Sequence, residues 1–231
     1  MGIPLRLLGG AAVEYHAHRG DNHEARQLKD VDLVTYRSSR VAVSKMLEKR
    51  GYVADRYVMA YFGDERFLYL HSEGGYKVDV FFEKLNFNHP IDLKPEGGPP
   101  RIELDYPTLA LADLLLSKLQ IHSPRAKDIT DLHTLLSAHE LAEEDVPERI
   151  NVARLASVLA DDWGFYYDAK ANLQRLTDLE TRPDESSARA KGRALELLRR
   201  IDAEPKTGRW RSREKAGTGR KWWNDVEELV R

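Results

Sequence analysis

Three aspartates stand in two segments whose alternation of residue types is typical of β-strands. Asp30 and Asp32 belong to the run Asp-Val-Asp-Leu-Val, and Asp79 is the centre of Lys-Val-Asp-Val-Phe. Side chains alternate between the two faces of a strand, so Asp30 and Asp32 should share one face, roughly 6.5 Å apart, while their apolar neighbours face the core. If the two strands are neighbours, the three carboxylates converge.

Carboxylates gathered in this way repel one another, and the pKa of at least one should be raised. A divalent cation removes the conflict, because hard oxygen ligands suit Mg²⁺ or Mn²⁺. Two such ions held about 3.5–4 Å apart can stabilise an in-line attack at phosphorus. The alternative is solvated charge at a strand edge, but an aspartate centred in an apolar strand is uncommon. We therefore predict that Asp30, Asp32 and Asp79 are catalytic metal ligands.

A Gly-Gly pair precedes the two paired aspartates by about twenty residues. Gly9 and Gly10 end the apolar run 5–8 and open a predicted helix. Glycine lets the backbone approach a ligand closely, and a helix N-terminus presents free N–H groups to phosphate. Most Gly-Gly pairs are simple turns, and this one gains its interest from its position before the aspartates.

The elements around these residues indicate an α+β fold, a small mixed β-sheet flanked by helices and followed by a helical domain. The predicted boundaries are 1–105 for the sheet domain and 106–231 for the helical domain. Beyond the strands already named, the pattern predicts a helix over 40–50, strands over 52–61, 66–71 and 76–82, a loop over 90–100, and helices over 107–122, 124–139, 151–160, 162–179 and 184–203.

The C-terminal stretch 206–223 is locally basic and contains Trp210, Trp222 and Trp223. Basic residues beside aromatic ones suit single-stranded or looped RNA, through phosphate contacts and base stacking. The alternative, which we favour, is a solvated tail whose tryptophans anchor it to the body of the protein.

Three histidines, His16, His18 and His23, precede Asp30, mostly in a polar segment. Histidines at such spacing can bind zinc. We favour the simpler interpretation that they are solvated loop residues.

The composition excludes several classes of function. The 231 residues include no cysteine, so disulfides, thiolate metal sites and cysteine nucleophiles are absent. A net charge of −2 gives no general attraction to polyanions, and no apolar run is long enough to cross a bilayer. We expect no membrane contact and a cytoplasmic location.

Together, the motifs resemble the signature of the DNA polymerase β-like nucleotidyltransferase superfamily. That signature is Leu-Gly-Gly-Ala at residues 8–11, Asp-Val-Asp at 30–32 and Val-Asp-Val at 78–80. The segments Ser-Lys-Leu-Gln at 117–120 and Lys-Asp-Ile-Thr-Asp-Leu at 127–132 look like those of the AbiEii-type toxin nucleotidyltransferases and their uncharacterised bacterial and archaeal relatives. One departure is the polar insertion between Gly10 and Asp30.

The resemblance implies a role for each matching position. Gly9 and Gly10 would cradle the triphosphate of an NTP, and the three aspartates would bind Mg²⁺ or Mn²⁺, with Asp79 also helping to deprotonate the attacking hydroxyl. Lys118 would reach the nucleotide phosphates. Lys127 and Asp128 would form a second polar patch of the nucleotide site.

Without the family resemblance, Lys118, Lys127 and Asp128 allow plainer structural interpretations. Lys118 is flanked by leucines and can be a lysine whose stem packs at the margin of the core. Lys127, Asp128 and Asp131 can form ordinary pairs along an exposed helix face.

The expected activity is therefore transfer of a nucleoside monophosphate from NTP to a hydroxyl of an acceptor, with tRNA, protein and small molecules all open. The rivals are a non-catalytic nucleotide-binding or regulatory module on the same fold, and a toxin with an antitoxin partner, which is a biological role for the same chemistry.

Overall fold

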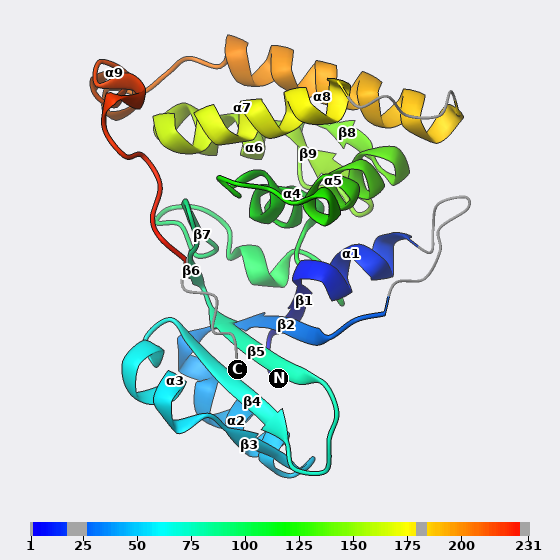
Figure 1. Ribbon diagram of the computed structural model, residues 1–231, viewed down its shortest axis with the longest axis vertical. Coiled ribbons are helices and arrows are strands. Elements are labelled where there is room, and N and C mark those ends of the chain that lie inside the picture. Colours follow the sequence, from blue (N-terminus) through cyan, green and yellow to red (C-terminus); the bar gives the residue numbers. More distant parts are fainter. Residues whose placement is uncertain (1, 18–26, 179–183, 227–231) are drawn as a thin grey trace.

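The computed structural model describes residues 2–17, 27–178 and 184–226. A mixed β-sheet occupies one end of the molecule and a group of helices the other, as Figure 1 shows. The chain is thus a mixed α/β protein, consistent with the predicted α+β class. Among the described residues, none of the helices combines the length and apolarity that crossing a bilayer requires.

The main sheet has five strands in the order β1-β2-β5-β4-β3. They are β1 (Leu5–Leu8), β2 (Asp30–Thr35), β3 (Tyr52–Ala54), β4 (Arg66–His71) and β5 (Lys77–Phe82). The pair β2–β5 is parallel, and the other neighbouring pairs are antiparallel. The two aspartate-bearing strands are therefore direct neighbours, the condition on which convergence of the carboxylates depends.

The two faces of the sheet belong to different cores. Helix α2 (Arg40–Glu48) packs its buried side chains against Val78 and Val80 of β5. On the opposite face, Leu8 of β1 joins the core formed with helix α1 (Gly9–Ala17) and the helical layer. Because residues alternate along β5, the side chain between Val78 and Val80 points towards that second face.

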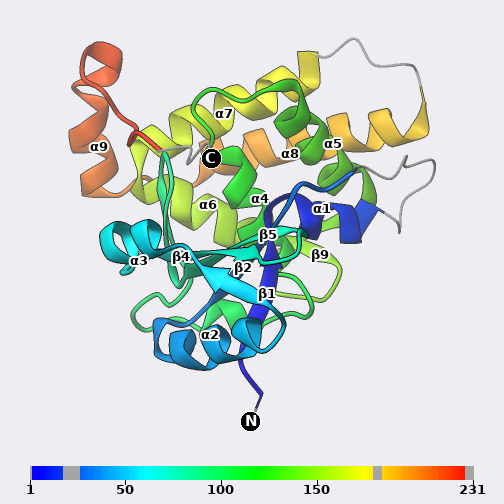
Figure 2. The same ribbon diagram turned by 60° about the horizontal axis from the view of Figure 1, so that its bottom comes forward.

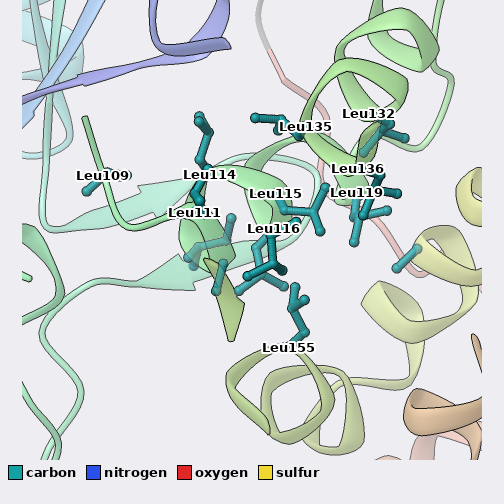
Figure 3. Close-up of a cluster of buried hydrophobic side chains, with 14 of the residues drawn as sticks. Leu109, Leu111, Leu114, Leu115, Leu116, Leu119, Leu132, Leu135, Leu136 and Leu155 are labelled. Atoms are coloured by element: carbon teal, nitrogen blue, oxygen red, sulfur yellow. The ribbon is translucent and has the colours of Figure 1, made fainter. Parts of the chain in front are cut away.

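The helical layer is built around α4, whose nine residues are all buried. It consists of α4 (Leu111–Leu119), α5 (Ala126–Ala138), α6 (Val152–Asp161), α7 (Trp163–Asp178), α8 (Glu185–Ala203) and the short α9 (Gly208–Glu214). Leucines of α4 interlock with those of α5 and α6, as Figure 3 shows. The helices predicted over 151–160, 162–179 and 184–203 are confirmed to within two residues.

Helix α1 belongs to the same hydrophobic core as α4 and α5 although it follows the first strand. Figures 1 and 2 both place α1 between the sheet and the helical layer. The domain boundary at residues 105 and 106 stays a prediction, since the core itself crosses it.

The strand predicted over 52–61 is wrong beyond Ala54. Asp55 follows, and its carboxylate accepts hydrogen bonds from the backbone N–H groups of Tyr57 and Val58. Such an N-cap starts helix α3 (Arg56–Phe62), which the run of aromatic and apolar residues obscured.

The helix predicted over 107–122 begins later, at Leu111. Before it the chain is extended, and Leu7 of β1 bonds with the carbonyl of Pro107 and the N–H of Leu109. This segment therefore pairs with the sheet before the chain turns into α4. The predicted loop over 90–100 also contains part of a hairpin, formed by β6 (Lys84–Asn86) and β7 (Pro90–Asp92).

The C-terminal basic stretch is attached to the body of the protein by its tryptophans. Trp210 of α9 is buried, and the indole N–H of Trp222 donates a hydrogen bond to Asp168 at 3.1 Å. The segment after α9 then runs to the β6–β7 hairpin, where the N–H of Asn224 bonds to the carbonyl of Asn88 (Figure 1). The anchoring interpretation is thus confirmed, but the stretch contains a helix and is not a simple tail.

Asp168 is the buried acceptor that joins this stretch to two other segments. Its carboxylate is 2.8 Å from Nε2 of His89 and 3.0 Å from Nδ1 of His122. Burial acts to raise the pKa of Asp168, but the hydrogen bonds from His89, Trp222 and His122 outweigh it, and the pKa lies below its usual value. The carboxylate is therefore ionised while it holds the three segments together.

A short parallel pair of strands, β8 (Glu140–Ala142) and β9 (Arg149–Asn151), links α5 to α6. The pair was not predicted, because each strand is only three residues long.

Candidate functional site

The two aspartate-bearing strands place Asp32 directly opposite Asp79 in the parallel register. Asp30 stands opposite Lys77, at the start of both strands, and is exposed. The predicted convergence of the three residues on one face is therefore supported by the strand pairing. Their metal-binding and catalytic roles stay predictions.

Asp79 lies in an enclosed position on the sheet. Only 7% of the residue is exposed, because Arg66 and Lys77 flank the carboxylate. Nη1 of Arg66 is 3.9 Å from Oδ1, and Nζ of Lys77 is 3.6 Å from Oδ2. Oδ1 is buried and accepts no hydrogen bond from the described residues, so it retains an unused lone pair.

The carboxylates of Asp32 and Asp79 are both difficult to ionise. Burial raises the pKa of Asp32 to about 6, and the charges of Asp30 and Asp79 add to the shift, while Lys118 and Lys77 oppose it. Burial also raises the pKa of Asp79, against the lowering effect of Arg66 and Lys77. The predicted raised pKa is confirmed, but desolvation contributes more than the like charges on which the prediction rested.

The Gly-Gly turn lies directly against this pair. Gly9 has a φ of +61°, and a Cβ placed on it would lie 2.0 Å from Oδ2 of Asp32. Leu8, at the end of β1, is the register partner of Asp32, so the first turn of α1 starts beside the carboxylate. Only glycine allows both the backbone conformation and this close approach.

Lys118, on the first helix of the helical layer, borders the same space as Gly9 and Asp32. A cavity of about 180 Å³ is lined by Leu8, Gly9, Asp32, Phe81, Phe87, Ser117, Lys118 and Gln120. The site is thus shared by both halves of the chain.

The ammonium group of Lys118 has a partner that the sequence did not suggest. Nζ of Lys118 is 2.7 Å from Oδ2 of Asp131 on α5, and both residues are buried. Asp131 therefore lies away from the exposed helix face on which the plainer interpretation placed it. The ion pair holds the lysine at the edge of the cavity.

Asp128 is also buried, and its carboxylate accepts a hydrogen bond from the N–H of Arg125 at 2.9 Å. This bond caps the start of α5, a structural role that the family resemblance does not include. Lys127 is exposed and lines a second cavity of about 430 Å³. That cavity shares Phe87 and Gln120 with the first one, so Lys127 and Asp128 lie on its continuation rather than beside the aspartates.

The residues present fit a hard divalent cation. The donors are carboxylate oxygens, one of them the buried Oδ1 of Asp79 with its unused lone pair. Ionisation of Asp32 and Asp79 is disfavoured without a counter-charge, and a cation would supply it. Asp30, Asp32 and Asp79 are the residues that would hold it.

Arg66 and Lys77 border the site but were not among the predicted residues. Lys77 is two positions before Asp79 on the same strand, so the period of two was a signal that could have identified it. Arg66 reaches Asp79 from β4, and only the pairing of β4 with β5 brings it there.

Of the three histidines considered from the sequence, the structure describes His16. His16 is buried at the end of α1, so it is not a solvated loop residue. His18 and His23 lie outside the described residues.

Comparisons with models of protein families, with curated proteins and with solved structures find no match to this chain. The resemblance to the nucleotidyltransferases therefore rests on the motifs and on the arrangement described above.

The raised pKa of Asp32 predicts that Asp32→Asn stabilises the metal-free protein at pH 8. Above pH 6 the folded protein holds an ionised carboxylate that is more stable in the unfolded chain, at a cost on the order of 3 kcal/mol. As the pH falls from 6 towards 4, the folded protein takes up the proton first and the cost disappears. Urea unfolding in EDTA at pH 8 and pH 4 should therefore show a gain only at pH 8.

The matched control is Glu73→Gln, which neutralises an exposed carboxylate in the β4–β5 hairpin and should leave both values unchanged. An equal gain for Asp32→Asn at both pH values would contradict the assignment.

Gly9→Ala should abolish the stabilisation of the protein by Mg²⁺, because the added methyl group would displace the carboxylate of Asp32. The left-handed backbone adds about 1–2 kcal/mol of strain. Gly74→Ala provides the control, since Gly74 has a similar φ of +80° but open space around it. Thermal unfolding with and without Mg²⁺ should show a normal metal response in Gly74→Ala alone. A full response in Gly9→Ala would show that the close approach is unimportant.

Proposed function

We propose that this protein is a metal-dependent nucleotidyltransferase that moves a nucleoside monophosphate from an NTP to a hydroxyl group. The observation that carries the proposal is the pairing of Asp32 with Asp79 on parallel strands, beside Gly9 and across a cavity from Lys118. The motif resemblance described above supports the same reaction.

In this proposal Asp30, Asp32 and Asp79 hold Mg²⁺ or Mn²⁺. When bound, the metal neutralises charge on the phosphates and on the attacking oxygen. Gly9 and Gly10 present the first N–H groups of α1 to the triphosphate, whose approach their lack of side chains permits. The buried Oδ1 of Asp79 is a suitable acceptor for a proton from the attacking hydroxyl.

Lys118 contributes a positioned charge. An ammonium group has three N–H donors, so the bond to Asp131 leaves others for a phosphate oxygen. Because Asp131 is buried, the ion pair fixes the direction of the lysine while the nucleotide is absent. We regard Asp131 as a positioning residue and assign Lys127 and Asp128 to the outer part of the nucleotide site.

The labelling experiment described below is designed to identify the acceptor and any partner. Trp210 and Trp222 are used to anchor the C-terminal stretch, which weighs against base stacking on these two residues. An antitoxin partner and an RNA acceptor are therefore alternatives that labelling of cell components can distinguish.

The direct test is turnover with α-³²P-labelled NTPs, Mg²⁺ and cell extract. The labelled pool identifies the acceptor as nucleic acid, protein or small molecule. Asp79→Asn should reduce transfer by more than the roughly 10- to 100-fold typical of losing a residue that merely supports a metal ligand. Glu73→Gln is the control and should be fully active. Tight binding of Mg-NTP without turnover would favour the regulatory module instead.

Lys118→Ala should weaken NTP binding without removing the thermal response to Mg²⁺. The variant also leaves the Asp131 carboxylate without its lysine, which in a buried pair costs about 3 kcal/mol. The double variant Lys118→Ala, Asp131→Ala removes both charges and should recover part of the stability while NTP affinity stays low. Recovery of NTP affinity together with stability would reduce Lys118 to a structural role.

A further inference from the structure

A second group of potential ligands lies at the other end of α1. His16 on α1, His139 at the end of α5 and Glu148 before β9 each offer one ligand atom, and these atoms all lie within 4.8 Å of one another. His16 and His139 are buried, with 1% and 3% of their surface exposed. The group is separate from the aspartate site, since it is at the opposite end of the nine-residue helix.

The three side chains are oriented towards one another. Nδ1 of His16 is 3.9 Å from Oε2 of Glu148, and Nδ1 of His139 is 3.5 Å from the same oxygen. The two imidazole rings meet edge to face with their centroids 4.8 Å apart. One carboxylate oxygen is thus approached by both histidines.

The hydrogen bonds of Thr108 set the tautomer of neutral His16. The Thr108 hydroxyl donates to the carbonyl of Leu109, so it must accept from Nε2 of His16, which is 2.9 Å away. A neutral His16 therefore carries its lone pair on Nδ1, the nitrogen that faces Glu148. A proton on the ring or a metal ion between them would allow these two acceptors to face each other.

The distances match a metal ion well. Bonds of about 2.0–2.1 Å in tetrahedral zinc place neighbouring ligand atoms about 3.3 Å apart. Nδ1 of His16 and Oε2 of Glu148, which are 3.9 Å apart, need only small side-chain movements to reach that value. Nδ1 of His139 donates a hydrogen bond to the backbone carbonyl of Glu148 at 3.2 Å, so Nε2 is the nitrogen that His139 would offer to the ion. A zinc-bound histidine usually donates its far ring N–H to an oxygen acceptor, and Nε2 of His16 has such an acceptor in the Thr108 hydroxyl.

We propose that His16, His139 and Glu148 form a Zn²⁺ site with two imidazole ligands and one carboxylate ligand. Mg²⁺ is the wrong ion for it, because imidazole favours zinc and similar transition metals. A cavity of about 840 Å³ is lined by both His139 and Glu148, so water can reach a fourth coordination position. The site joins α1 to α5, which lie side by side in Figures 1 and 2.

The test is Zn²⁺ binding to the purified full-length protein after removal of metals with a chelator. Calorimetry should give one Zn²⁺ per chain with a Kd below about 1 µM. Co²⁺ in its place should show the visible absorption of a four-coordinate site with nitrogen ligands. Glu148→Gln, in which the carboxylate is half-exposed and the fold is not at risk, should weaken binding by at least about 100-fold.

His139→Asn provides a second ligand variant and should lose the Co²⁺ absorption. His133→Gln is the matched control, because His133 lines the same cavity without belonging to the group, and it should bind Zn²⁺ normally. Asp32→Asn separates this site from the aspartate site and should also bind Zn²⁺ normally. The proposal is overturned if the protein binds no Zn²⁺, if both ligand variants bind it unchanged, or if Asp32→Asn alone removes it.

Discussion

The enclosure of α4 is the constraint on which the rest of the structure depends. A helix buried along its whole length must find a counter-charge for every ionised group that it carries. Asp113 receives hydrogen bonds from Arg101 at 2.8 Å and from Arg154 at 3.1 Å, and Lys118 is held by Asp131. These pairs join α4 to α5, to α6 and to the segment before it, so apolar packing and charge pairing fix the helix together.

The candidate site follows from where this fixed helix meets the sheet. Lys118, near the end of α4, is held over the edge where β1 and β2 place Gly9 and Asp32. The same enclosure removes water from Asp32 and Asp79, which is why burial is the leading cause of both raised pKa values. A site that opposes ionisation of its own carboxylates has an unmet demand for positive charge, a pattern more typical of function than of stability.

The alternation of residue types along each strand predicted those features of the candidate site that depend on a single strand. The apolar neighbours of Asp79 made its face predictable, and the Gly-Gly turn was placed correctly between strand and helix. Errors arose where a local signal competed with a stronger one, as when the cap at Asp55 turned an apparently strand-like run into α3. Pro107 failed as a helix start for a tertiary reason, because the chain there pairs with Leu7.

Residue patterns within one strand or helix could not predict the contacts between distant segments. No periodicity relates Lys118 to Asp131, or His16 to His139, because each pair depends on how helices pack rather than on spacing within one element. From the sequence, His16 was considered only with its neighbours His18 and His23, whereas the two potential ligands that the structure brings to it, His139 and Glu148, are over 120 positions away.

Helices α1 and α5 connect the two groups of polar residues. Gly9, at the start of α1, touches Asp32, and His16, seven residues later, lies about 10 Å along the same axis. On α5, Asp131 holds Lys118, and His139 stands just beyond the last turn. Each helix therefore carries one contact to the candidate nucleotide site and one to the histidine group. A cation that joined the two helices at His16 and His139 would restrict the movement of Gly9 relative to Lys118, which both line the cavity, without itself approaching the nucleotide.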